Sequence, residues 1–169
     1  PFEKVWDVID LRPQRRTISV EMMTRDGIPI SCEASIRFRI DDGGQEPTSD
    51  VPYPFDEQAI VTAATIKRRK PGGVIQDWTA RIAGGSLDGA IRNRLETYNL
   101  DEFLASSEDP MPPVAQLQEE IFEATRKDGE GLGIIVEQVQ LGPIQPDEEA
   151  VSRQWLEAWQ SEWQNFAAK

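Results

Sequence analysis

The stretch TRDGIPISCEASIRFRI, which runs from Thr24 to Ile40, decides the fold. From Ile28 onward its even-numbered residues are apolar or small, and its odd-numbered residues are Pro, Ser, Glu or Arg. Successive side chains of a β-strand point to opposite faces, so this period of two predicts one long strand with a dry face and a wet face. The residues of the dry face are Ile28, Ile30, Cys32, Ala34, Ile36, Phe38 and Ile40.

The residues before this strand predict a hairpin. A two-residue loop would pair Glu21 with Cys32 and mix the wet face with the dry one. A three-residue loop, Arg25 to Gly27, pairs Val20 with Cys32 instead and places glycine at the left-handed position that such loops require. The pairs expected from this loop are Met22 with Ile30, Val20 with Cys32 and Ile18 with Ala34.

The rest of the chain predicts two more strands and several helices. Residues 5–11 alternate like a strand that ends before Arg12-Pro13, and residues 41–54 are rich in Pro, Gly and Asp, which favours an exposed loop. Helices are expected from a cap at Asp56 to about Lys67, and over 74–83. After an interruption at Gly84-Gly85, another is expected from a cap at Ser86 to Tyr98, with a short helical turn over 100–104. The last two are expected from Pro112-Pro113 to Gly129 and from Pro146 to the end. A last strand is expected to contain Ile135, Val139 and Leu141 and to end at Gly142-Pro143.

This order of elements predicts an α+β fold. We expect an antiparallel or mixed curved sheet of about four strands with helices packed on one face, followed by a C-terminal helix. Residues 1–145 are expected to form the domain, and residues 146–169 the start of a helix that takes part in oligomerisation.

Composition removes several classes of function. The 169 residues include 30 acidic and 18 basic ones, giving a net charge of −12, which disfavours nucleic acid as a partner. The chain has no histidine and one cysteine, so zinc sites and Ser-His or Cys-His nucleophiles are not expected. We therefore predict no catalytic residues, no metal and no cofactor, and Cys32 is expected to be a small core residue.

Several stretches, taken in order, resemble the stomatin/prohibitin homology domain, which is also called the SPFH or band 7 domain. The resemblance covers nearly the whole chain, although the segments 41–54 and 67–85 are longer than is usual for that family. The stretches are Val8-Ile9-Asp10-Leu11-Arg12-Pro13-Gln14, Thr24-Arg25-Asp26-Gly27-Ile28-Pro29-Ile30, Ile36-Arg37-Phe38-Arg39-Ile40, Leu100-Asp101-Glu102-Phe103-Leu104, Gly133-Ile134-Ile135-Val136-Glu137 and residues 144–151.

The resemblance implies a non-catalytic scaffold that sits beside a membrane, forms homo-oligomers and organises membrane proteins or lipids. Family members carry a hydrophobic anchor before the domain and a long, often coiled helix after it. Here the chain begins without Met and ends within a predicted helix, so we expect an anchor in a segment outside it. A monomeric adaptor that binds one partner, such as a membrane protease, is the alternative function. The side of the membrane is left open.

Two surfaces are the candidate contact sites. A tryptophan stripe on the last helix is favoured to pack between subunits, while packing on its own domain and insertion at a bilayer interface stay open. The wet face of the long strand is expected to meet solvent or a partner. The candidate interface residues are Trp155, Trp159, Trp163, Phe166, Glu33, Arg37 and Arg39.

One dense run of basic residues has two possible interpretations. Lys67, Arg68, Arg69 and Lys70 either contact anionic lipid or an acidic partner, or form a solvated helix end, which is the favoured interpretation.

Overall fold

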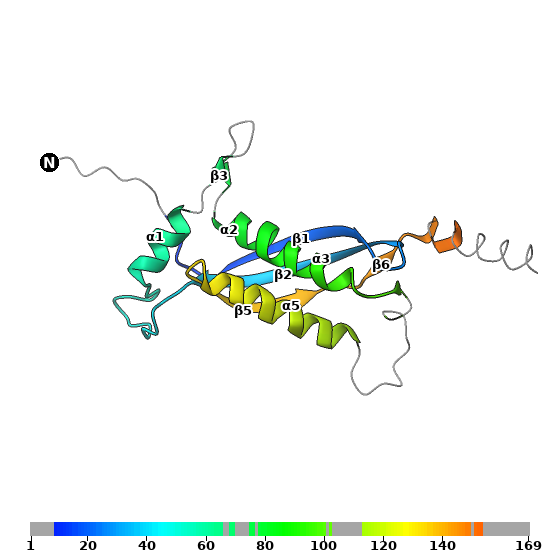
Figure 1. Cartoon of the computed structure of the whole chain (residues 1–169). Helices are drawn as coiled ribbons and strands as arrows, with labels where there is room; N and C mark the ends of the chain where they lie inside the picture. The colour runs from blue at the N-terminus through cyan, green and yellow to red at the C-terminus, as the bar shows by residue number, and fades with distance from the viewer. Residues whose placement is uncertain are drawn as a thin grey trace, which may run out of the picture.

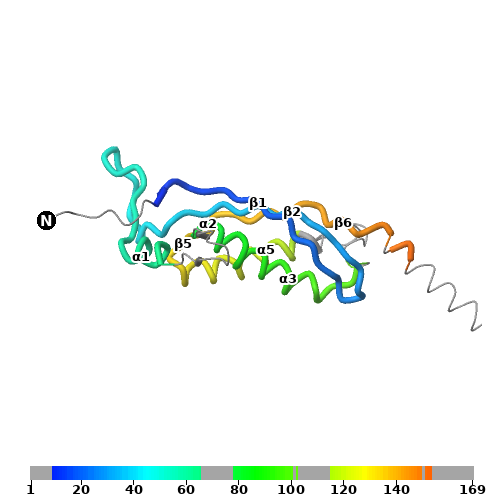
Figure 2. Tube along the Cα trace, turned by 90° about the horizontal axis from the view of Figure 1, so that it is seen from above, coloured from blue at the N-terminus to red at the C-terminus, as the bar shows by residue number. Residues whose placement is uncertain are grey.

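The computed structural model of the chain describes residues 9–65, 68–69, 75–76, 78–100, 102, 113–149 and 151–153. They form an elongated body of two layers, a β-sheet on one side and helices on the other (Figure 1, Figure 2). The strands are β1 (Gln14–Met23), β2 (Pro29–Ile40), β3 (Arg68–Arg69), β4 (Ile75–Gln76), β5 (Ile134–Leu141) and β6 (Gln145–Pro146). The helices are α1 (Glu57–Thr65), α2 (Trp78–Arg81), the π-helix η1 (Ile82–Leu87), α3 (Asp88–Leu95) and α5 (Pro113–Glu130), and residues 148–149 and 151–153 are also helical.

The main sheet is open and contains four strands, in the order β1-β2-β5 with β6 also paired to β2. Every pairing in it is antiparallel, so the α+β prediction is confirmed in its antiparallel form. The predicted register is also confirmed, because Val20 lies opposite Cys32 and Met22 lies opposite Ile30. The small β3–β4 pair forms a separate two-stranded sheet.

The tip of the β1–β2 hairpin is stabilised by Thr24, Asp26 and Gly27. The amide of Thr24 donates to the Ile28 carbonyl at 3.0 Å, which closes the three-residue loop, and Gly27 takes the expected left-handed conformation with φ +80°. The buried Thr24 hydroxyl oxygen accepts the Ile28 amide at 3.0 Å. The carboxylate of Asp26 accepts the Leu100 amide at 3.3 Å, so the tip is fixed against the segment that follows α3.

The dry face of β2 forms the centre of the core. All of its even-numbered residues from Ile30 to Ile40 are buried, as the alternation predicts. The helices α2, α3 and α5 cover this face, with α5 against β5 and α3 against β1 (Figure 2). Cys32 is buried there, and burial raises the pKa of its thiol, which confirms its expected role as a core residue.

Two helix predictions are wrong. The segment 74–83 is not one helix, because Ile75–Gln76 forms β4 and the helix begins at Trp78. Gly84-Gly85 does not interrupt the chain of helices either, since α2, η1 and α3 follow one another without a break and Ser86 is buried inside η1 rather than capping a helix. Burial of Ile82 and Leu87 in the core outweighs the low helix propensity of the glycines.

The ends of the predicted strands also differ from expectation. Residues 9–13 are not in a strand, and β1 begins at Gln14. The register between β2 and β5 shifts where Arg37 pairs with Gln138 and Phe38 pairs with Val136, so that Glu137 of β5 is the additional residue of a β-bulge. The bulge reverses the alternation, and Ile134 and Val136 are buried whereas Ile135 is only half-buried.

The caps of two helices confirm or refine the sequence interpretation. Asp56 caps α1, because its Oδ1 accepts the Ala59 amide at 2.9 Å. Pro146 belongs to β6 rather than to the first turn of the last helix. Asp147 takes the capping position there, with its Oδ1 accepting the Glu149 amide at 2.9 Å.

Candidate functional site: the outer face of the sheet

The second face of the sheet is polar, and none of the described helices covers it (Figure 2). Its residues are the odd-numbered ones of β1 and β2, which the register places opposite one another. We call this surface the outer face. The opposed pairs are Arg15 with Arg37, Thr17 with Ser35, Ser19 with Glu33 and Glu21 with Ser31.

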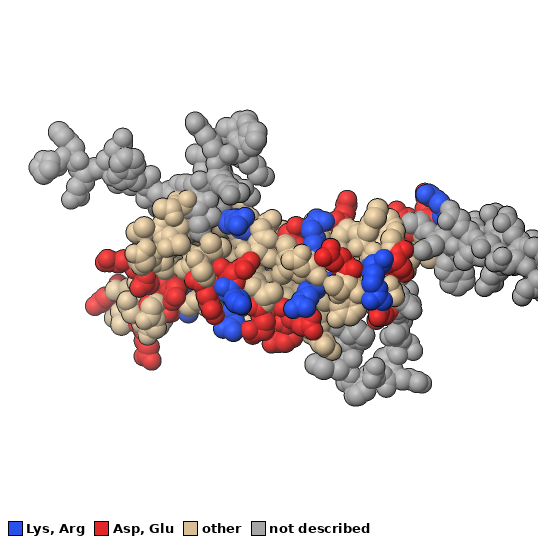
Figure 3. All heavy atoms as spheres, viewed as in Figure 1, with Lys and Arg blue, Asp and Glu red and all other residues tan. Residues whose placement is uncertain are grey.

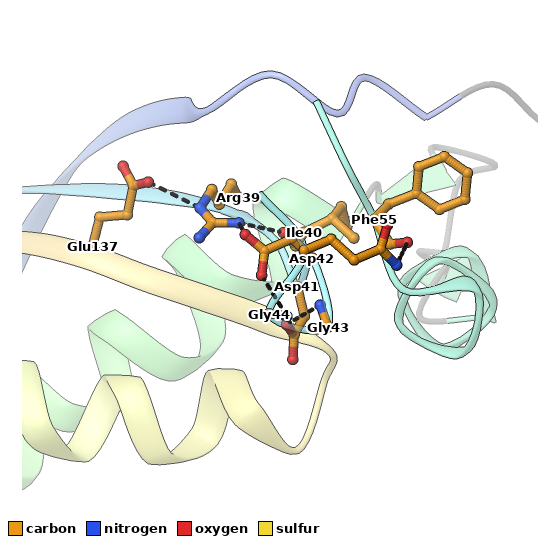
Figure 4. A network of polar contacts seen from close by, with 9 residues as sticks. Arg39, Ile40, Asp41, Asp42, Gly43, Gly44, Phe55 and Glu137 are labelled. Carbon is orange, nitrogen blue, oxygen red and sulfur yellow. Dashed lines mark hydrogen bonds and ion pairs between the residues drawn. The ribbon is translucent and has the colours of Figure 1, made fainter. Parts of the chain in front are cut away.

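Near the end of β2, the outer face carries a network of charged side chains. Arg39 donates from Nε to Glu137 Oε1 at 3.1 Å and from Nη1 to Asp42 Oδ2 at 2.5 Å (Figure 4). The other oxygen of Glu137 contacts Arg37 Nε at 2.8 Å. The second oxygen of Asp42 accepts the Gly44 amide at 3.0 Å. The network therefore joins β2 both to the bulge of β5 and to the loop that leads to α1.

The network lowers the pKa of Asp42. Burial alone would raise this pKa, but the hydrogen bonds from the Gly44 amide and from Arg39, together with the charge of Arg39, outweigh it. Because the folded-state pKa lies below the unfolded value of about 3.9, the network stabilises the fold fully above that pH. The stabilisation is lost as the pH falls through the folded-state pKa.

Replacing Asp42 by Asn is expected to lower the free energy of unfolding by roughly 1–2 kcal/mol at pH 7, because an ion pair whose side chains are 27 % and 15 % exposed loses its charge-assisted hydrogen bond. The difference between the two proteins should shrink below pH 4. Urea denaturation followed by circular dichroism at pH 7 and pH 3.5 measures both values. An equal difference at the two pH values would contradict the assignment.

Asp41→Asn is the matched control for this experiment. Asp41 precedes Asp42, and its Oδ1 accepts only the Gly43 amide, at 2.9 Å, among the side-chain contacts of the described residues. Asparagine also accepts such a bond. The control variant should therefore unfold within about 0.5 kcal/mol of the unmodified protein at pH 7.

At one end of the outer face lies a shallow basic depression of about 400 Å³. Its charged side chains are Arg15 and Arg37, and none of the described residues that line it is acidic. The other lining residues are Pro13, Gln14, Ser35, Gln138 and Gln140.

At the other end of the outer face lies an acidic groove of about 590 Å³, between the ends of β1 and β2 and the start of the last helix. Its charged residues are Glu21, Asp147, Glu148 and Glu149, and the part of its lining that the structure describes contains no basic residue. The outer face thus has two ends of opposite charge.

The predicted interface residues divide into two groups. Glu33, Arg37 and Arg39 lie on the outer face, as the alternation indicates, and both arginines already contact Glu137. Trp155, Trp159, Trp163 and Phe166 lie outside the described residues, so their packing stays a prediction.

The basic run does not form a helix end in its described part. The helix α1 ends at Thr65, and Arg68 and Arg69 form β3, which pairs with β4. Lys67 and Lys70 lie outside the described residues. A contact of this run with anionic lipid or an acidic partner stays a prediction.

Sequence reasoning missed Arg15, Glu137 and Asp42. The apolar pattern of the first hairpin strand begins at Ile18, so no strand was predicted at Arg15. Continuing the predicted register three residues beyond the Ile18–Ala34 pair nevertheless places Arg15 opposite Arg37. The contacts of Glu137 depend on the bulge in β5, and no simple sequence pattern marks that bulge.

Carboxylates are the side chains of this chain that could bind a metal ion or take part in acid–base chemistry. Within the described part of the chain, no three His, Cys, Asp or Glu side chains group closely enough to hold a metal ion. Glu119 and Glu120 are adjacent carboxylates of α5. Glu120 accepts a hydrogen bond from Gln116 and contacts Arg94 at 3.5 Å, so its contacts are with other side chains on the surface of the helical layer.

Comparison with protein families adds the decisive observation. The family model described as "SPFH domain / Band 7 family" matches residues 1–160. The chain belongs to this family. The SPFH family is generally membrane-associated, oligomeric, scaffold-like and non-catalytic. The comparison with curated proteins gives no match. Among the helices of the described residues, none has the length and apolar character needed to cross a bilayer.

Proposed function

We propose that this SPFH domain is a non-catalytic scaffold module that associates with copies of itself beside a membrane and thereby organises membrane proteins or lipids. The observation that supports this proposal is the outer face. One face of the sheet is sealed by α2, α3 and α5, whereas the described helices leave the outer face open (Figure 2). An exposed sheet face with charged groups at both ends suits contacts with neighbouring proteins better than it suits chemistry.

The polar character of this face sets the strength of the expected contacts. Exposed ion pairs contribute only about 0–1 kcal/mol each, so two free copies in solution should associate weakly. A shared membrane raises the effective concentration of tethered copies, and weak contacts then become populated without any new interaction. Self-association should therefore depend on tethering.

The experiment compares free and tethered copies. The chain contains no histidine, so an added N-terminal hexahistidine tag is the sole attachment point for nickel-chelating lipid vesicles. Donor and acceptor dyes are attached to a cysteine that replaces the exposed Ser49, while the buried Cys32 stays unlabelled. We expect energy transfer on vesicles above that of a tethered monomeric protein at equal surface density, and little transfer in solution.

Energy transfer no greater than that of the monomeric reference, over the whole range of surface density, would overturn the proposal. Recovery of a single stoichiometric partner without self-association would favour the adaptor function instead.

A further inference from the structure

The basic depression carries an unbalanced positive charge. Arg15 and Arg37 lie directly opposite each other on β1 and β2, an arrangement in which like charges repel. Arg37 is neutralised by Glu137 at 2.8 Å. Arg15 is exposed, and its contact in the described part of the chain is a long hydrogen bond of 3.4 Å to the Ser35 hydroxyl. Among the described residues no carboxylate contacts Arg15, so the depression can accept a negative group.

The lining of the depression indicates which negative group fits. Guanidinium groups bind carboxylates through paired, parallel hydrogen bonds. Ser35, Gln138 and Gln140 add hydroxyl and amide donors around the two arginines. Arg37 already contacts Glu137, and none of the described lining residues offers a carboxylate to Arg15. A carboxylate side chain of a protein suits this set of donors.

The chain's own carboxylates at the acidic groove cannot reach the depression. Arg15 and Glu21 are on the same face of β1, six residues apart, which corresponds to about 20 Å along a strand. The side chains between them on the outer face are small, namely Thr17 and Ser19 on β1 and Ser31 and Ser35 on β2, with the exception of Glu33. The face therefore allows close approach of another molecule.

We propose that the basic depression at Arg15 and Arg37 binds the acidic groove at Glu21 and Glu148 of a second copy of this chain. The proposal rests on the proposed function and specifies which surfaces meet. The two ends of the outer face are complementary in charge, and with a net charge of −12 two copies would otherwise repel. The contact should weaken as salt is added, because it is exposed to solvent.

The test uses charge reversal in the vesicle assay described above. The variant R15E/R37E should lose the energy transfer that exceeds the monomeric reference. Its matched control is R126E/K127E, which changes net charge by the same amount on α5, where Arg126 pairs with Glu123 and Glu130. On the face of the molecule that carries the helices, basic and acidic groups are interspersed (Figure 3). The control should keep most of the transfer.

A charge exchange separates local pairing from overall repulsion. Adding E21K and E148K to R15E/R37E exchanges the two charged ends and returns the net charge to −12, so energy transfer should be restored. Adding E96K and E119K instead also returns the net charge to −12, but these exposed residues of the helical side lie outside the acidic groove, so transfer should stay lost.

Three outcomes have distinct meanings. Absence of transfer in the unmodified chain overturns the proposed function itself. Transfer that persists in R15E/R37E, or that E96K and E119K restore as well as E21K and E148K do, overturns only the assignment of the surfaces. Circular dichroism checks the fold of each variant. If R15E/R37E fails to fold, the neutral variant R15Q/R37Q removes the repulsion between the arginines and should also lose transfer, and retained transfer there counts against the assignment.

Discussion

Replacing Phe38 by alanine is expected to lower the free energy of unfolding by roughly 3–5 kcal/mol. Phe38 is 0 % exposed and lies near the C-terminal end of β2. Its ring meets that of Trp78, at the start of α2, edge to face with a centroid separation of 5.4 Å. Alanine would leave a cavity between the sheet and the helical layer, and the aromatic contact would be lost in addition.

The measurement is urea denaturation followed by circular dichroism, with Phe55→Ala as the matched control. Phe55 is 36 % exposed in the loop before α1, so its truncation should cost less than about 1 kcal/mol. Equal midpoints for the two variants would show that β2 does not organise the core as described. The same result would undermine the fold assignment, since that assignment depends on the dry face of β2.

The dry face is also the part of the fold that the sequence predicts best. Strict alternation over β2 leaves one face apolar, and a shift of register by one residue would bury charges. That constraint was enough to predict the hairpin register, the position of Gly27 and the outward direction of Arg37 and Arg39. Each of these depends on local pattern and turn chemistry.

The features that the sequence did not predict depend on distant parts of the chain. The continuous helix through Gly84-Gly85 exists because Ile82 and Leu87 pack into the core, a tertiary effect that outweighs local propensity. The bulge at Glu137 arises from the pairing of β5 with β2, which are far apart in sequence. Two-residue strands such as β6 are too short to give a periodic signal.

In the candidate site, too, local pattern predicts some features, while others depend on contacts between distant parts of the chain. Alternation places the arginines of β2 on the outer face, but their partners come from β5 and from the loop after β2. Arg15 was missed because β1 begins at Gln14, before the alternation of apolar and polar residues starts. In this first part of the strand, Arg15 and Arg16 are both charged, so no alternation marks it as a strand. The positive end of the outer face therefore becomes visible when the β1–β2 register is continued beyond the Ile18–Ala34 pair, whereas the contacts of Arg37 and Arg39 with Glu137 depend on the pairing of β5.

Replacing Gly133 by alanine is the second change expected to have a large effect, with a loss of roughly 2–4 kcal/mol in the free energy of unfolding. Gly133 precedes β5 and has φ +69°, a conformation that costs a residue with a Cβ about 1–2 kcal/mol. A Cβ built there would lie 2.7 Å from Ala59 Cα in α1, and backbone atoms cannot yield as a flexible side chain does. The helix α1 would therefore have to move. Gly133 itself is tied to the end of β2, because its carbonyl accepts a hydrogen bond of 3.0 Å from the Asp41 amide.

Gly27→Ala separates the two causes, because Gly27 has a similar φ of +80° but no atom within 4 Å of an added Cβ. It should lose only the conformational part, about 1–2 kcal/mol. The excess loss in Gly133→Ala then measures the cost of the close approach between α1 and the turn before β5. Equal losses in the two variants, measured by the same urea denaturation, would mean that α1 yields at no cost, and that its position at the end of the sheet is not fixed by this contact.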